Sequence, residues 1–149
     1  MNTATVRADE VLELARTLLS EGDDGNAADI QTLDEALQAH VRRRSSYILT
    51  LRERSQLDAE RAARTDLCPL GKWLLGPGRA RDEMKTVQEL AAAHVAFHEQ
   101  SGAIARAINA GRYDEARATL QSTRSGLNRA SHMMVTLLVR LKKELASTH

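Results

Sequence analysis

Apolar residues recur along most of the chain at intervals of three and four, the spacing of amphipathic helices. This pattern predicts a first helix over residues 5–20, a loop over residues 21–26, where glycines and acids are paired, and a second helix over residues 28–55. The apolar stripe of the second helix consists of Ile30, Leu33, Leu37, Val41, Ile48 and Leu51, and His40 falls within it.

The periodicity fails between residues 56 and 81 and then resumes. Within this irregular stretch, Pro69 and a glycine-rich stop after Leu75 predict one short helix over residues 70–75. Long helices are predicted over residues 82–109 and 112–146, and the last has the heptad spacing of bundle packing. The sequence therefore predicts an all-α fold, an antiparallel four-helix bundle with a short extra helix.

Composition and charge narrow the class of protein. The 149 residues fit a single domain, with an N-terminal helix and loop (1–27) before a bundle (28–146). The net charge is only +1 and acids alternate with bases, so no nucleic-acid partner is expected. No apolar run approaches the roughly 18 residues of a membrane span, and no signal peptide is recognisable. The single cysteine cannot form an internal disulfide, which favours a reducing, cytoplasmic location without a membrane partner.

Four residues form a candidate metal site. Cys68 directly precedes the short helix, and His94 and His98 are four residues apart, so they project from one side of a helix. His40 lies roughly 22 Å before its predicted helix ends, and the histidine pair lies roughly 18 to 24 Å after the next long helix begins. If these helices are antiparallel neighbours, the histidines lie at one height. Three histidines and a thiolate are ligands that tetrahedral zinc accepts, and the spacing permits a closed site.

Other chemically distinctive residues have plainer interpretations. Asp66 is a candidate hydrogen-bond acceptor for a ligand imidazole. Trp73 is expected to anchor the short helix by packing. The remaining residues are expected to be solvated surface (Arg42, Arg43, Arg44, Lys72 and His132), an unsupported tail residue (His149), and core or near-core fillers (Met133 and Met134).

The run from Cys68 to Leu74 (Cys-Pro-Leu-Gly-Lys-Trp-Leu), preceded by His40 and followed by His94 and His98, resembles the chemoreceptor zinc-binding (CZB) domain family. Members of this family occur in bacterial chemoreceptors and diguanylate cyclases and as free-standing proteins, and the resemblance covers about residues 33–145. It implies a three-histidine, one-cysteine Zn²⁺ site in a four-helix bundle that senses zinc, and in some members oxidants. It also implies action on signalling proteins, often as a homodimer. The sequence shows no output domain, so the signal is expected to leave through a partner or through self-association.

Four functions remain open at this stage. The first is a zinc-responsive regulator, and the second makes Cys68 an oxidation trigger. A zinc hydrolase is disfavoured because catalytic zinc keeps a position open for water, and because Val95 stands where a His-Glu-x-x-His motif places its glutamate. A structural zinc in an adaptor or dimerisation protein requires the same closed ligand set as a sensor. The expectation is thus a non-enzymatic zinc protein.

Overall fold

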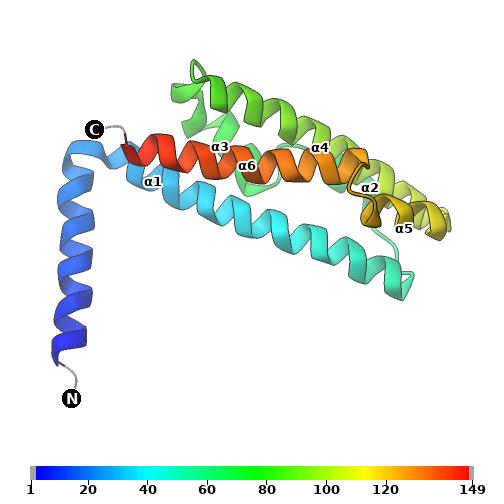
Figure 1. Cartoon of the computed structure of the whole chain (residues 1–149), viewed down its shortest axis with the longest axis horizontal. Helices are drawn as coiled ribbons and strands as arrows, with labels where there is room; N and C mark the ends of the chain where they lie inside the picture. Colours follow the sequence, from blue (N-terminus) through cyan, green and yellow to red (C-terminus); the bar gives the residue numbers. More distant parts are fainter. Residues whose placement is uncertain (1–2, 148–149) are drawn as a thin grey trace.

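The computed structural model describes the backbone of residues 3–147 and the side chains of residues 26–147, and this part contains helices but no strand. The elements, shown in Figure 1, are α1 (Thr3–Glu53), α2 (Ala59–Ala63), α3 (Pro69–Leu75), the 3₁₀ helix η1 (Pro77–Arg81), α4 (Lys85–Asn109), α5 (Tyr113–Gln121) and α6 (Gly126–Ser147). The all-helical class is confirmed. No helix of the described part combines the length and the apolar character needed to cross a membrane.

Helix α6 lies between α1 and α4 and is antiparallel to both (Figure 1). Towards α1, the Asn26 amide donates to the Leu145 carbonyl at 3.1 Å, whereas His40 contacts Ser131 at 2.7 Å. The partner's number falls as the α1 number rises, which is the order of antiparallel neighbours. Towards α4, Thr86 donates to Glu144 and Gly126 lies beside Gln100, which gives the same order.

The segment between α1 and α4 (residues 54–84) forms the fourth element of the bundle and is called the returning leg below. It begins beside the C-terminal end of α4, where the Leu57 amide donates to the Asn109 side chain at 2.8 Å. It reaches the other end of the bundle at Trp73, whose indole N–H donates to Asp29 of α1 at 2.9 Å. Because this leg returns the chain to its starting end, α1 and α4 run in the same direction. The condition for placing the histidines at one height, that their two helices are antiparallel neighbours, is therefore not met.

The core lies between α1, α4, α6 and the returning leg. Its largest fully buried side chains are Trp73, Phe97, Leu33, Leu90, Ile108, Leu127, Leu137, Leu138, Leu141 and Leu145. The predicted role of Trp73 as a packing anchor is confirmed, since only 2 % of this residue is exposed. Two predicted core residues of α1 are instead on the surface, since Val41 is 54 % and Ile48 is 40 % exposed.

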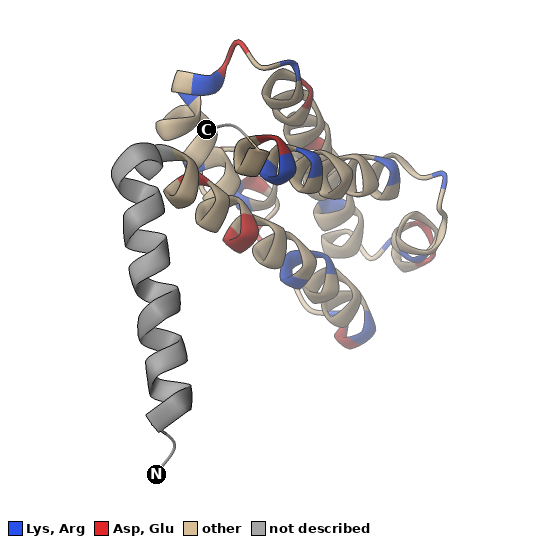
Figure 2. Cartoon of the chain, turned by 60° about the vertical axis from the view of Figure 1, so that its left-hand side comes forward, with Lys and Arg blue, Asp and Glu red and all other residues tan. Residues whose placement is uncertain are grey.

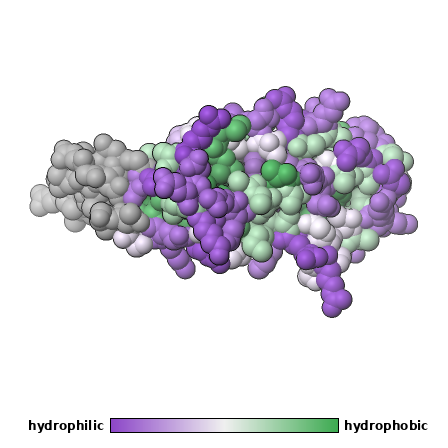
Figure 3. Space-filling model, turned by 90° about the horizontal axis from the view of Figure 1, so that it is seen from above, coloured by the Kyte–Doolittle hydropathy of each residue, from purple (hydrophilic) through white to green (hydrophobic). Residues whose placement is uncertain are grey.

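Charged and apolar residues share the rest of the surface. Lysines and arginines are interspersed with acids along the described helices (Figure 2). On the face shown in Figure 3, apolar surface is divided by hydrophilic side chains. This mixture matches the small net charge of the sequence.

The predicted loop at residues 21–26 is wrong, because α1 has helical backbone through this stretch. Glycine lowers helix propensity by only about 1 kcal/mol per residue, and tertiary contacts override such a preference. One such contact is the hydrogen bond from Asn26 to α6. The N-terminal helix and loop predicted over residues 1–27 include side chains that, up to residue 25, lie outside the described part.

The single helix predicted over residues 112–146 is also wrong, because residues 122–125 separate α5 from α6. Ser125 starts α6, where its hydroxyl accepts from the Asn128 backbone N–H at 3.1 Å. The Asn128 side-chain amide donates to the last carbonyls of α5 and its connection, those of Thr119, Leu120 and Ser122, at 3.2, 2.9 and 2.7 Å. Serine and asparagine side chains thus replace helical backbone hydrogen bonds at the break.

Replacing Asn128 by alanine tests this account of the break. Asn128→Ala removes three donations to carbonyls and the acceptor that holds Arg44 of α1 at 2.5 Å. We expect the free energy of unfolding, measured with urea, to fall by about 2–3 kcal/mol. Arg129→Ala, on the exposed side of the same turn, is the matched control and should change it by less than about 0.5 kcal/mol. Equal effects of the two substitutions would contradict the assigned role.

Candidate metal centre

Cys68, His94 and His98 converge on one point. The Cys68 Sγ atom lies 3.1 Å from Nε2 of His94 and 3.5 Å from Nε2 of His98. The three candidate ligand atoms all lie within 4.8 Å of one another. Tetrahedral zinc, with bonds of about 2.3 Å to sulfur and 2.0 Å to nitrogen, separates its ligand atoms by roughly 3.3–3.6 Å. These three residues could therefore hold a metal ion with little rearrangement.

Helix α4 supplies the two histidines from its buried face. Because the residues are four apart, their rings lie one turn from each other, with centroids 4.5 Å apart and planes at 83°. Each histidine is only 2 % exposed. Two imidazoles are thus fixed on the same side of one rigid helix.

A backbone carbonyl fixes the tautomer of His98. The Nδ1 atom lies 2.9 Å from the carbonyl oxygen of Ala62, which can only accept a hydrogen bond. Nδ1 therefore carries the proton, and the lone pair of the neutral ring is on Nε2, the atom that faces Cys68. The Arg43 guanidinium lies 3.4 Å from the same Nδ1. A protonated Nδ1 cannot accept a hydrogen bond from this guanidinium, so we assign the shorter contact, to the Ala62 carbonyl, as the hydrogen bond.

The backbone around Cys68 packs closely against a neighbouring segment of the chain. Cys68 is the N-cap of α3, and its sulfur accepts from the Gly71 backbone N–H at 3.4 Å. Pro69 follows at the first helical position, where its missing N–H costs nothing. A Cβ atom at Gly71 would lie 1.7 Å from the Thr65 carbonyl oxygen, so only glycine permits the two backbones to pass this closely. Capping and packing together orient the thiol toward α4.

His40 lies next to this cluster without being part of it. Its Nε2 atom is 2.7 Å from the Ser131 hydroxyl, and its ring packs edge-on against Phe97 with centroids 4.4 Å apart. Its Nδ1 atom is buried and has no hydrogen-bond partner among the described residues. His40 lines a cavity of about 170 Å³ together with Cys68 and His98. The structure thus brings three of the four predicted ligands together and places the fourth on the wall of the same cavity.

Burial keeps the imidazoles neutral. It lowers the pKa of His40 and of His94 to about 4, with further lowering from the positive charge of Arg43 and, for His40, of Arg44. The pKa of His98 is also lowered by burial, although its hydrogen bond to the Ala62 carbonyl acts in the opposite direction. At neutral pH all three rings are therefore in the form that binds metal ions.

The other residues singled out from the sequence lie away from the cluster or at its edge. Asp66 bonds to Arg64 at 2.6 and 3.0 Å, and the Arg64 contact lowers the pKa of the Asp66 carboxyl. His132 is exposed, as predicted. Met134 is buried, whereas Met133 is 49 % exposed and is not a core filler.

Four contributors to the site were missed by sequence reasoning. Arg43 and Arg44, interpreted as solvated surface, are only partly exposed and contact His98 and Asn128 respectively. The Ala62 carbonyl carries no sequence signal, since every residue has one. Ser131 offers a weak signal, a small polar residue beside an apolar heptad position.

No protein-family model, no curated protein and no solved structure matches the chain. The resemblance to the CZB family accordingly remains a prediction from the quoted residues.

The depressed histidine pKa values predict acid lability of the metal-free protein. The unfolded chain binds a proton on each histidine below pH about 6.5, whereas folded His40 and His94 do so only near pH 4. Stability is therefore full above pH 6.5 and falls as the pH drops toward 4. Between pH 7.5 and 5 we expect a loss of about 2 kcal/mol for each of the two rings in urea unfolding with chelator present.

Two variants test the assignment of this pH dependence. His94→Gln should reduce the loss, because the glutamine side chain does not titrate. His132→Gln, at an exposed position, should leave it unchanged. A wild-type free energy of unfolding that is flat from pH 7.5 to 5 would show that the buried rings do not resist protonation.

Proposed function

We propose that this protein is a zinc-binding regulatory module in which Cys68, His94, His98 and His40 hold the metal. The observation that carries the proposal is the convergence of one thiol and two imidazoles at separations close to those of a metal's ligand shell. Thiolate and imidazole ligands suit zinc, whereas magnesium and calcium prefer oxygen ligands.

His40 is proposed as the fourth ligand on the strength of its surroundings. A buried imidazole nitrogen without a partner costs free energy, and Nδ1 of His40 is such an atom. The ring borders the cavity that Cys68 and His98 also line. A fourth protein ligand leaves no open position for substrate water, so the proposed role is regulatory and non-enzymatic.

The regulatory character follows from the origin of the ligands. They come from α1, from the connection before α3 and from α4, so a bound metal ties the returning leg to two long helices. Metal binding at such sites contributes on the order of 10 kcal/mol and is coupled to folding. Loss of zinc is proposed to loosen residues 56–81. The output is proposed to pass through a homodimer or a signalling protein of chemoreceptor or cyclase type, as the CZB resemblance implies.

Metal content of the purified chain and its variants tests the site. We expect about one zinc per chain by atomic emission, and at least tenfold weaker zinc binding in His40→Ala, Cys68→Ala, His94→Ala and His98→Ala. His132→Ala is the matched control, because this histidine is exposed. Zinc that is indifferent to His40→Ala would remove His40 from the ligand set.

The absence of zinc from wild-type protein purified without chelator, together with failure to bind added zinc, would overturn the proposal. If zinc binds, hydrogen exchange separates regulation from a permanent structural role. Residues 56–81 should exchange faster after chelation, and the zinc should exchange with added isotope. Zinc that never exchanges would identify a structural metal in an adaptor.

A second role, as an oxidant sensor, is favoured by the exposure of Cys68. Its side chain is only partly buried, whereas His94 and His98 are almost inaccessible. Of the three clustered residues, Cys68 is therefore the one most open to a peroxide. In this reaction the thiolate sulfur forms a bond to one peroxide oxygen, the O–O bond breaks, and hydroxide leaves, so that two electrons pass from sulfur to peroxide. The sulfenic acid is a poorer ligand than the thiolate.

Peroxide titration of the zinc-loaded protein tests this role. We expect one zinc to be released for each Cys68 converted to sulfenic acid, with release followed by a chromogenic chelator and oxidation by mass spectrometry. Met133→Leu, which removes an exposed and oxidisable sulfur, should not change the release. Peroxide-dependent release that persists in Cys68→Ser would exclude Cys68 as the trigger.

A further inference from the structure

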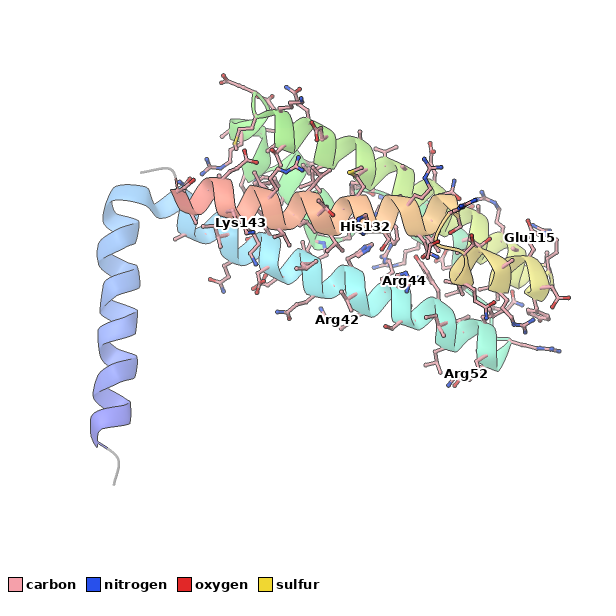
Figure 4. All side chains as sticks on the ribbon, in the orientation of Figure 1. Arg42, Arg44, Arg52, Glu115, His132 and Lys143 are labelled. Atoms are coloured by element: carbon pink, nitrogen blue, oxygen red, sulfur yellow. The ribbon has the colours of Figure 1, made fainter. Side chains whose placement is uncertain are left out.

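A groove follows the C-terminal half of α1 where this helix faces α5 and the start of α6. It consists of two adjoining cavities of about 680 and 410 Å³ that share Leu120 and Gln121. Arg44 of α1 and His132 of α6 lie at the space between their helices (Figure 4). Because the cavities share these two lining residues, they adjoin, and together they are called the groove below.

The α1 side of the groove is one uncovered helix face. Its lining residues Val41, Arg44, Ser45, Ile48 and Arg52 recur at intervals of three and four. Val41 and Ile48 are 54 % and 40 % exposed, although the periodicity of the sequence is that of a buried stripe. From residue 40 to residue 54 the face is roughly 20 Å long, which suits about four turns of a second helix.

The charge of the groove selects an acidic occupant. Arg44, Arg52, Arg54 and Arg117 line it, and no acidic residue is among its lining residues in the described part. Arg117 also pairs with the fully exposed Asp114 at 2.8 Å, and Arg54 lies over the Tyr113 ring. Arg44 is held by Asn128. An apolar strip edged by guanidinium groups favours an amphipathic helix with acids beside its apolar stripe.

The chain itself contains such a segment. Residues 3–25 carry six acidic and two basic side chains, in contrast to the balanced charge of the whole sequence. Val11, Leu14 and Leu18 follow helical spacing, and Glu10 and Glu13 adjoin them. With 23 residues, the segment is long enough to cover the groove.

We propose that the groove binds residues 3–25 of a second copy of this chain. The segment precedes the groove on the same helix, α1, so a continuous helix cannot place its own segment there. Each copy has one segment and one groove, and a two-fold axis lets both copies exchange them in a closed dimer. This inference says how the homodimer named under the proposed function forms, and it rests on the homodimer part of that proposal. It does not require the metal, so metal-free and zinc-loaded protein are both measured.

Sedimentation equilibrium of the full chain and of charge-reversal variants tests the exchange. The wild type should be a dimer whose dissociation constant rises with salt. Glu10→Arg/Glu13→Arg reverses two charges beside the apolar stripe of the segment, and Arg52→Glu/Arg117→Glu reverses two charges of the groove without touching the Arg44 contacts. Each should weaken dimerisation at least tenfold. Arg79→Glu/Lys143→Glu reverses two exposed basic side chains outside the groove lining, and should leave the dimer unchanged.

Mixing the two reversed variants provides the decisive measurement. In the mixed dimer the two reversed charges of one segment meet the two reversed charges of the partner's groove, and the other segment and groove keep their wild-type charges. An equimolar mixture should therefore regain wild-type affinity as a heterodimer. A monomeric wild type, or a dimer unaffected by either reversal, would overturn the proposal. A groove that binds its own segment would leave the mixture monomeric, and binding of a different acidic protein would leave the wild type monomeric. If the dimer persists while zinc does not bind, only the metal site of the proposed function fails.

Discussion

Burying several histidines in a helical bundle imposes a strict requirement, because each ring has two nitrogens that need partners or a metal. The structure meets most of this requirement from within the chain. The Ala62 carbonyl accepts from His98, Ser131 bonds to His40, and the Cys68 sulfur lies against His94. The Ala62 carbonyl on one side of His98 leaves Nε2 of that ring directed at the thiol, which Nε2 of His94 also faces, while Nδ1 of His40 remains unpaired in the described structure. An unpaired buried nitrogen beside two converging ones is costly in an apolar core and useful in a metal site.

The returning leg makes this arrangement available. This segment lies beside α1 and α4 and consists of short helices whose backbone packs closely against neighbouring segments. Trp73 docks the leg on α1 through Asp29, which also accepts from Arg81 at 2.6 Å. Gly71 lets α3 pass against the Thr65 carbonyl. Since Cys68 lies between the Ala62 contact to α4 and the Trp73 contact to α1, its thiol is held from both sides. The position of the thiol is therefore a property of packing and precedes any metal.

The sequence predicted those features that depend on local spacing. Two histidines four apart must share a helix face, and Pro69 with Gly71 marks the start of a short helix, so the cluster of Cys68, His94 and His98 was accessible from the residues alone. Helix direction was not, since periodicity is the same for parallel and antiparallel neighbours. Val41 and Ile48 show the same limit, because an apolar stripe does not reveal whether a partner helix is present. The break between α5 and α6 depends on Asn128, whose side chain forms hydrogen bonds to preceding carbonyls and to Arg44. Helix propensity does not take such contacts into account.

His40 is shared by the candidate metal centre and the groove. It borders the cavity of the candidate metal centre and also lines the groove on α1. Its hydrogen bond to Ser131 fixes it to α6, the helix that forms the opposite wall of that groove. If the His40 ring moved toward Cys68, its hydrogen bond to Ser131 would lengthen and the lining of the groove would change. Because linkage between two sites is reciprocal, binding in the groove would in turn affect the position of the ring. The exposed stripe that looked like core in the sequence thus adjoins the candidate metal centre through the side chain of His40, which lines both cavities.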